Sequence, residues 1–120
     1  MKMELNEYQK RAMTTCTDSS HNFAYMFMNL VGEVGEFASK VAKRIRKGYD
    51  HIEHNDIISE ETISKDDIEE IRKESGDILW QLSGLCSVMG WSLEDVAQEN
   101  LKKLADRQKR NVIVGEGDNR

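Results

Sequence analysis

Four acidic residues occur in two copies of one short pattern. Glu33 and Glu36 stand three apart in the stretch EVGE, and Glu74 and Asp77 stand three apart in ESGD. Residues three apart on an α-helix lie on the same face, one turn from each other. Each pair therefore presents two carboxylates to one side of its helix. If the two helices pack side by side, four carboxylates converge on one small volume.

Converging carboxylates repel one another unless a cation neutralises them. Hard oxygen ligands of this kind suit Mg²⁺, with Mn²⁺ also possible. Solvated surface acids give the same pattern, because charged helices carry many such pairs. Both interpretations stay open on the spacing alone. A carboxylate-bridged di-iron site is disfavoured, because it needs glutamate and histidine three apart on its helices, and the histidines supply no such pair.

Basic residues follow the first acid pair on the same helical face. Lys40, Arg44 and Lys47 lie one to three turns beyond it and would face the phosphates of a metal-bound nucleotide. For Lys40, an ion pair with Glu36 four residues earlier is an equally good interpretation. His51 and His54 stand three apart in an acidic segment, which fits either a metal clip or a hydrated loop.

Four helical segments are needed to position these residues. Hydrophobic spacing and end signals place them at 5–17, 22–47, 64–89 and 92–110. Ser64 and Ser92 are suitable N-terminal caps, and Gly48 and Gly90 are suitable ends. Residues 48–63 lack periodicity and are expected to form a flexible acidic linker, and 111–120 an irregular tail. The sequence thus predicts an all-α, four-helix bundle with an antiparallel central pair.

Composition agrees with a single domain over residues 1–120. The chain is 38% hydrophobic, contains no proline and carries a formal net charge of -5, which disfavours a nucleic-acid polymer as partner. Cys16 and Cys86 have no nearby cysteine and are expected to be reduced thiols. No apolar run could span a membrane, and no signal peptide is visible. A cytoplasmic location is expected.

Gly32 and Gly35 lie inside the second helix, where each costs about 1 kcal/mol relative to alanine. They share a seam of mostly small residues, which continues through Ala24, Met28, Ser39 and Ala42. Such seams let helix backbones approach closely. We therefore expect another helix to pack on this seam, within the bundle or across a dimer, and to fix the separation of the carboxylates.

Three motifs together resemble the MazG-like all-α nucleoside triphosphate pyrophosphohydrolases. They are GEVGEF (32–37), ESGDILWQL (74–82) and ENLKKLADR (99–107), and the resemblance runs from about His21 to Arg120. It implies a four-helix bundle that dimerises through its long central helices and often forms tetramers. It also implies magnesium-dependent cleavage of the α–β phosphoanhydride, which releases a nucleoside monophosphate and pyrophosphate.

The resemblance assigns roles residue by residue. Metal ligands would be Glu33, Glu36, Glu74 and Asp77, with Glu33 or Glu36 as the general base. Substrate contacts would come from the set Lys40, Asn100, Lys103, Arg107 and His21. The segment between the acid pairs is longer than usual, since 37 residues separate Glu36 from Glu74. A non-catalytic nucleotide-binding dimer and a phosphoribosyl-ATP pyrophosphohydrolase remain the alternatives.

Overall fold

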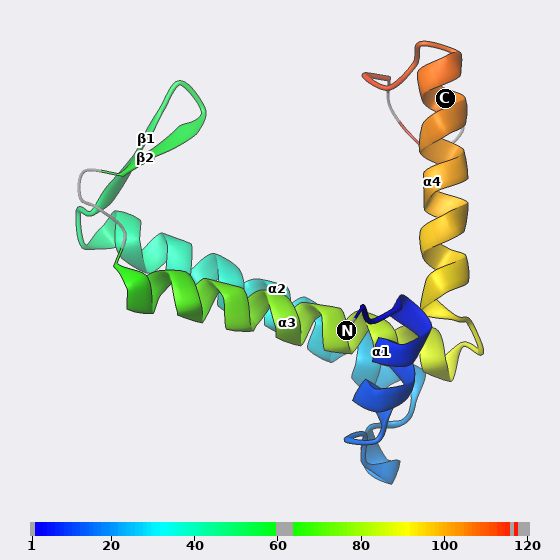
Figure 1. The fold of residues 1–120 in the computed structure, drawn as a ribbon. Coiled ribbons are helices and arrows are strands. Elements are labelled where there is room, and N and C mark those ends of the chain that lie inside the picture. The colour runs from blue at the N-terminus through cyan, green and yellow to red at the C-terminus, as the bar shows by residue number, and fades with distance from the viewer. Residues whose placement is uncertain (1, 60–63, 116, 118–120) are drawn as a thin grey trace.

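The computed structural model describes residues 2–59, 64–115 and 117. Along the chain the elements are α1 (Leu5–Met13), the 3₁₀ turn η1 (Asp18–Ser20), α2 (Phe23–Arg46), β1 (Asp50–Glu53), β2 (Asp56–Ser59), α3 (Lys65–Val88) and α4 (Leu93–Lys109). Helices α2 and α3 form a long antiparallel pair, with α1 beside one end and the strands beyond the other (Figure 1). The all-α class predicted from the sequence is confirmed for the body of the molecule, apart from the two short strands.

Local end signals set the helix boundaries. The side chains of Asn22, Ser64 and Ser92 each accept a hydrogen bond from the backbone N–H three residues later. At the other end of α2, Gly48 has φ +79°, and its N–H bonds to the carbonyl of Ile45. This left-handed end is the structure glycine favours, and it satisfies carbonyls that the helix leaves unpaired. The predicted caps at Ser64 and Ser92 and the end at Gly48 are confirmed.

At Gly84 the side chain of Met26 from α2 packs directly against the backbone of α3. A Cβ atom added to Gly84 would clash with Sδ of Met26, a residue that is completely buried. By contrast, a Cβ on Gly35 would meet nothing within 4 Å, and one on Gly32 only the side chain of Asn29 on its own helix. The expectation that Gly32 and Gly35 receive another helix is therefore wrong within one chain. Packing there by a second chain stays a prediction.

Helix α1 is fastened to the junction between α3 and α4. Gln9, only 9% exposed, donates a hydrogen bond to the carbonyl of Trp91 at 3.0 Å and accepts one from the N–H of Leu93 at 2.8 Å. Trp80 on α3 donates its indole N–H to the carbonyl of Ala12. Because Gln9 satisfies the backbone at the start of α4, it fixes how that helix leaves the body.

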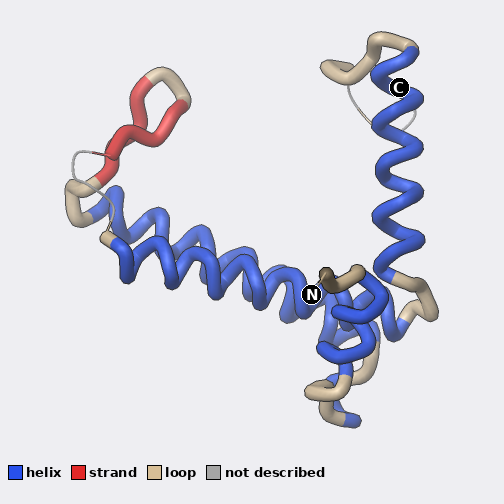
Figure 2. The backbone as a smooth tube through the Cα atoms, viewed as in Figure 1, coloured by secondary structure: helices blue, strands red, loops and turns tan. Residues whose placement is uncertain are grey.

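The segment after α2 forms a β-hairpin, where the sequence predicts a flexible acidic linker. Strands β1 and β2 form a two-stranded antiparallel hairpin (Figure 2). Its register places Ile52 opposite Ile57. His54 and Asn55 link them, both with positive φ, as a tight two-residue hairpin turn requires. The expected linker is thus corrected over 50–59, and its remainder at 60–63 lies outside the described residues. Of the expected tail, the described residues beyond Asn111 form turns and bends.

The four helices do not close into a bundle within one chain. Helix α4 leaves the end of α3 and projects away from the α2–α3 pair (Figure 1). The radius of gyration is 17.8 Å, against about 14 Å for a compact domain of this length. The accessible surface is 9275 Å², against about 6,600 Å² for a compact monomer of this mass. The predicted four-helix bundle is therefore incomplete in the single chain.

Apolar side chains along α2 account for part of this excess surface. Leu30, Phe37, Val41 and Ile45 are only half-buried, and Val34 is exposed. Along α2, Met28 is 71% and Val31 59% exposed. Among the described residues, the fully buried hydrophobic side chains are few, namely Met26, Cys86 and Leu93. None of the described helices is long and apolar enough to cross a membrane.

Replacing Gln9 with alanine should destabilise the fold. The change leaves the buried N–H of Leu93 without its acceptor, which costs about 1–3 kcal/mol. Urea denaturation followed by circular dichroism measures the loss. The matched control is Gln98→Ala on the exposed face of α4, where we expect a change of less than about 0.5 kcal/mol. Equal stabilities for the two variants would contradict the role given to Gln9.

Candidate metal centre

The structure brings three of the four predicted acids together in the middle of the α2–α3 pair. Carboxylate oxygens of Glu33, Glu36 and Glu74 lie within 4.8 Å of one another. Glu33 and Glu36 come from successive turns of α2, and Glu74 comes from α3 opposite them. Among the described residues this is the cluster with the spacing needed to hold a metal ion. We call these three residues the carboxylate cluster.

The electrostatics of the carboxylate cluster show that it is short of positive charge. Burial raises the pKa of Glu33 above its ordinary value, and the negative charges of Glu36, Asp77 and Glu74 raise it further. Oε2 of Glu33 and Oε2 of Glu74 are buried and receive no hydrogen bond from the described residues. A buried carboxylate oxygen without a donor is costly. Two such atoms in one cluster are suited to coordinating a divalent cation.

Asp77, the fourth predicted acid, lies next to the carboxylate cluster. Its charge acts on Glu33, and it also acts on Tyr8 of α1, whose pKa is raised mainly by burial and secondarily by Asp77. Tyr8 is half-buried on α1, and its phenol lies near enough to Asp77 for the charge of that carboxylate to act on it. Tyr8 is not among the site residues predicted from the sequence. No local signal identifies it, because its position depends on how α1 packs on α3.

The basic residues beyond the cluster are engaged in ion pairs between elements. Lys40 lies 3.3 Å from Glu70 and 3.7 Å from Glu74, both on α3. The alternative pair of Lys40 with Glu36 on its own helix is not formed among the described residues. Since Lys40 contacts Glu74 of the cluster directly, it partly neutralises that carboxylate and stands where a ligand of the cluster would meet it.

The remaining predicted substrate contacts are not brought to the cluster within one chain. Asn100 and Lys103 line a surface hollow on α4 itself, and Arg107 is buried on the same helix. Helix α4 points away from the α2–α3 pair (Figure 1). His21 is exposed just before α2, and the helix carries Glu33 about 15 Å from its first residue. A single chain therefore supplies the acids and Lys40, and not the other four residues.

Comparison with known proteins identifies the family. The model of the MazG nucleotide pyrophosphohydrolase domain matches residues 22–112, a range that includes all four predicted acids. The chain belongs to this family of nucleotide pyrophosphohydrolases. It is also similar to the Gene 37 protein of Mycobacterium phage L5, with 39% identity over 103 residues, 86% of this chain and 81% of that protein. No solved structure gives a significant match.

Replacing Glu33 with glutamine should stabilise the protein when divalent cations are removed by a chelator. The amide is neutral, so the repulsion from Glu36 and Glu74 disappears, and a melting temperature several degrees above the unaltered chain is expected at neutral pH. Adding Mg²⁺ or Mn²⁺ should raise the melting temperature of the unaltered chain more than that of the variant.

Glu69→Gln on the exposed face of α3 is the matched control, because it removes the same charge away from the cluster. Thermal denaturation of the three proteins, with and without metal, makes the measurement. If the Glu33→Gln protein melts below the unaltered chain without metal, the repulsion assigned to the carboxylate cluster is contradicted.

Proposed function

We propose that this protein is a magnesium-dependent nucleoside triphosphate pyrophosphohydrolase. Membership of the family supports nucleotide pyrophosphohydrolysis as the class of reaction. The observation that carries the proposal to this chain is the carboxylate cluster, with its two buried oxygen atoms that receive no hydrogen bond. The proposed products are a nucleoside monophosphate and pyrophosphate. Mg²⁺ is the preferred ion and Mn²⁺ a substitute, because all the ligands are carboxylate oxygens.

In this proposal each side chain has a separate role in metal binding, proton transfer or charge stabilisation. Glu33, Glu36, Glu74 and Asp77 hold the metal, which when bound supplies Lewis-acid activation of phosphate and water. Glu36 is more exposed than Glu33, so it is the better placed of the two to accept a proton from the attacking water. Lys40 adjoins Glu74 and would stabilise negative charge on the phosphates.

We further propose that the functional unit is a homodimer. The single chain exposes roughly 2,700 Å² more surface than a compact monomer of its mass, which is about the area that each subunit contributes to large obligate homodimer interfaces. The seam through Met28, Gly32 and Gly35 is exposed, and Val31 beside it is exposed too, so it offers an apolar face to a second copy. In a dimer, Asn100, Lys103, Arg107 and His21 of one copy would serve the carboxylate cluster of the other.

Glu36→Gln should abolish turnover and leave the fold intact. Loss of a general base or metal ligand lowers the rate by at least about 100-fold, and the exposed position of Glu36 makes misfolding a minor concern. Asp77→Asn should behave alike. The measurement is pyrophosphate release from a panel of nucleoside triphosphates with Mg²⁺.

Glu69→Gln controls for the loss of charge and should keep full activity. Full turnover by Glu36→Gln would overturn the site assignment. Nucleotide binding by the unaltered protein, without pyrophosphate at any Mg²⁺ or Mn²⁺ concentration, would favour a non-catalytic binding dimer.

Gly35→Leu should disrupt assembly while sparing the single chain. A side chain at this position meets open space within one chain, and leucine is the better helix former. Any damage must therefore come from a second copy packed on the seam. We expect a shift from dimer to monomer by sedimentation, together with loss of activity and weaker Mg²⁺ binding. Glu69→Leu is the control for added apolar surface, and a fully active dimeric Gly35→Leu protein would refute the assignment.

A further inference from the structure

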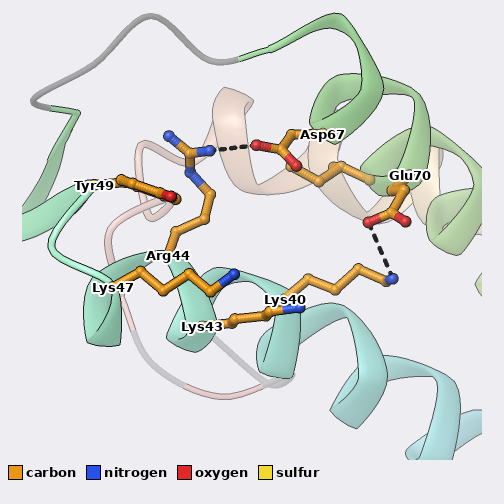
Figure 3. A pocket seen from close by; sticks show the side chains of 8 residues that line it. Lys40, Lys43, Arg44, Lys47, Tyr49, Asp67 and Glu70 are labelled. Carbon is orange, nitrogen blue, oxygen red and sulfur yellow. Dashed lines mark hydrogen bonds and ion pairs between the residues drawn. The ribbon is translucent and has the colours of Figure 1, made fainter.

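A basic pocket lies at the hairpin end of the α2–α3 pair, beyond the carboxylate cluster. It has a volume of about 180 Å³ and is lined by four cationic side chains, those of Lys40, Lys43, Arg44 and Lys47, together with Tyr49 and residues of α3. Figure 3 shows Lys40, Lys43 and Lys47 along the same side of α2, facing the acids of α3 across the hollow. We call this hollow the basic pocket.

Two of these four cations, Arg44 and Lys40, form ion pairs with acids that surround the pocket. The guanidinium of Arg44 donates to both carboxylate oxygens of Asp50, at 2.8 and 3.1 Å. It also donates to Asp67 at 2.6 Å (Figure 3). It also lies 5.6 Å from the centre of the Tyr49 ring. With its side chain only 11% exposed, Arg44 fixes β1 and α3 against α2. Lys40 forms ion pairs with Glu70 and Glu74, and together these contacts fix the shape of the pocket.

The other two cations, Lys43 and Lys47, have no ion-pair partner among the described residues, and both are exposed. They stand four apart, one turn from each other, where like charges destabilise a helix. Their place near the C-terminus of α2 offsets part of this repulsion through the helix dipole. An anion between the two ammonium groups would remove it.

The basic pocket continues into the carboxylate cluster. A second hollow, of about 290 Å³, is lined by Glu36, Ser39, Lys40, Lys43 and Glu74. It shares Lys40 and Lys43 with the basic pocket, so acidic and basic side chains follow one another along α2. At 180 Å³ the basic pocket is smaller than the roughly 300–1,000 Å³ typical of whole-ligand sites, and it suits a small anion.

We propose that the basic pocket is a subsite for a phosphate chain of the pyrophosphate class, held by Lys43 and Lys47. Compact ammonium groups bind phosphate as point charges, which is common in nucleotide sites. The choice of phosphate among anions rests on the proposed function of the neighbouring cluster. The chain has two possible sources, the terminal phosphates of a nucleotide bound at the cluster or a separate pyrophosphate ion.

The direct test is calorimetric titration of the full-length protein with pyrophosphate, in a chelator and at low salt. Without divalent metal the carboxylate cluster repels anions, so binding reports the basic pocket. Lys43→Gln/Lys47→Gln should weaken binding at least tenfold, as expected when charge-assisted contacts are lost. The matched control, Lys73→Gln/Lys102→Gln, removes the same charge from exposed positions on α3 and α4 and should bind like the unaltered protein.

Absence of binding, or equal loss in both double variants, would overturn the subsite. Circular dichroism melting of each variant verifies that the fold is kept. The titration measures binding only, so its result does not depend on whether the protein hydrolyses nucleotides. Binding without turnover supports the subsite even if the proposed activity fails, and turnover without binding removes the subsite alone.

Kinetics then separate the two sources of phosphate. If the nucleotide's own terminal phosphates occupy the pocket, Lys43→Gln/Lys47→Gln raises KM for the triphosphate, and pyrophosphate competes with it. If a separate ion occupies the pocket, KM is unchanged, and pyrophosphate binds together with a non-hydrolysable triphosphate. Either result supports the phosphate subsite and names its occupant.

Discussion

Crowding of carboxylates between α2 and α3 is the constraint on which the rest of the structure depends. Helices packed this closely place three acidic side chains within 4.8 Å of one another, against their mutual repulsion. The pair must therefore be held together elsewhere. At one end Met26 packs onto Gly84, and at the other Arg44 joins α2 to Asp67. The acids occupy the span between these two fastenings, so helix packing sustains a local charge arrangement that would otherwise separate.

Features that depend on local sequence could be predicted. Helix bounds follow from hydrophobic spacing and from capping side chains such as Ser64 and Ser92, whose hydrogen bonds span three residues. The convergence of Glu33, Glu36 and Glu74 also follows, because helical periodicity fixes the face of each acid and consecutive long helices of a bundle usually pack antiparallel. The sequence also contains part of the signal for the hairpin. Ile52 and Ile57 flank an asparagine in a two-residue turn, but their strands are too short to show clear alternation.

Features that depend on contacts between distant residues could not be predicted. Both Gly32 and Gly84 are glycines inside helices, yet only Gly84 receives the neighbouring helix of the same chain. The partners of Lys40 lie thirty or more residues away, so a local rule favours Glu36 instead. Tyr8 comes near Asp77 only through the docking of α1, which Gln9 fixes across more than eighty residues. Helix periodicity states which face is apolar but not which element covers it.

The contact between Met26 and Gly84 also gives the molecule an internal chemical reporter. Oxygen added to the sulfur of Met26 would have no room, because the thioether lies against the bare backbone of Gly84. Peroxide can therefore modify Met26 only when α2 and α3 separate at that end. Met28, two residues along the same helix, is 71% exposed and reacts without any such opening. The ratio of the two oxidation rates measures how often the helices that carry the carboxylates part.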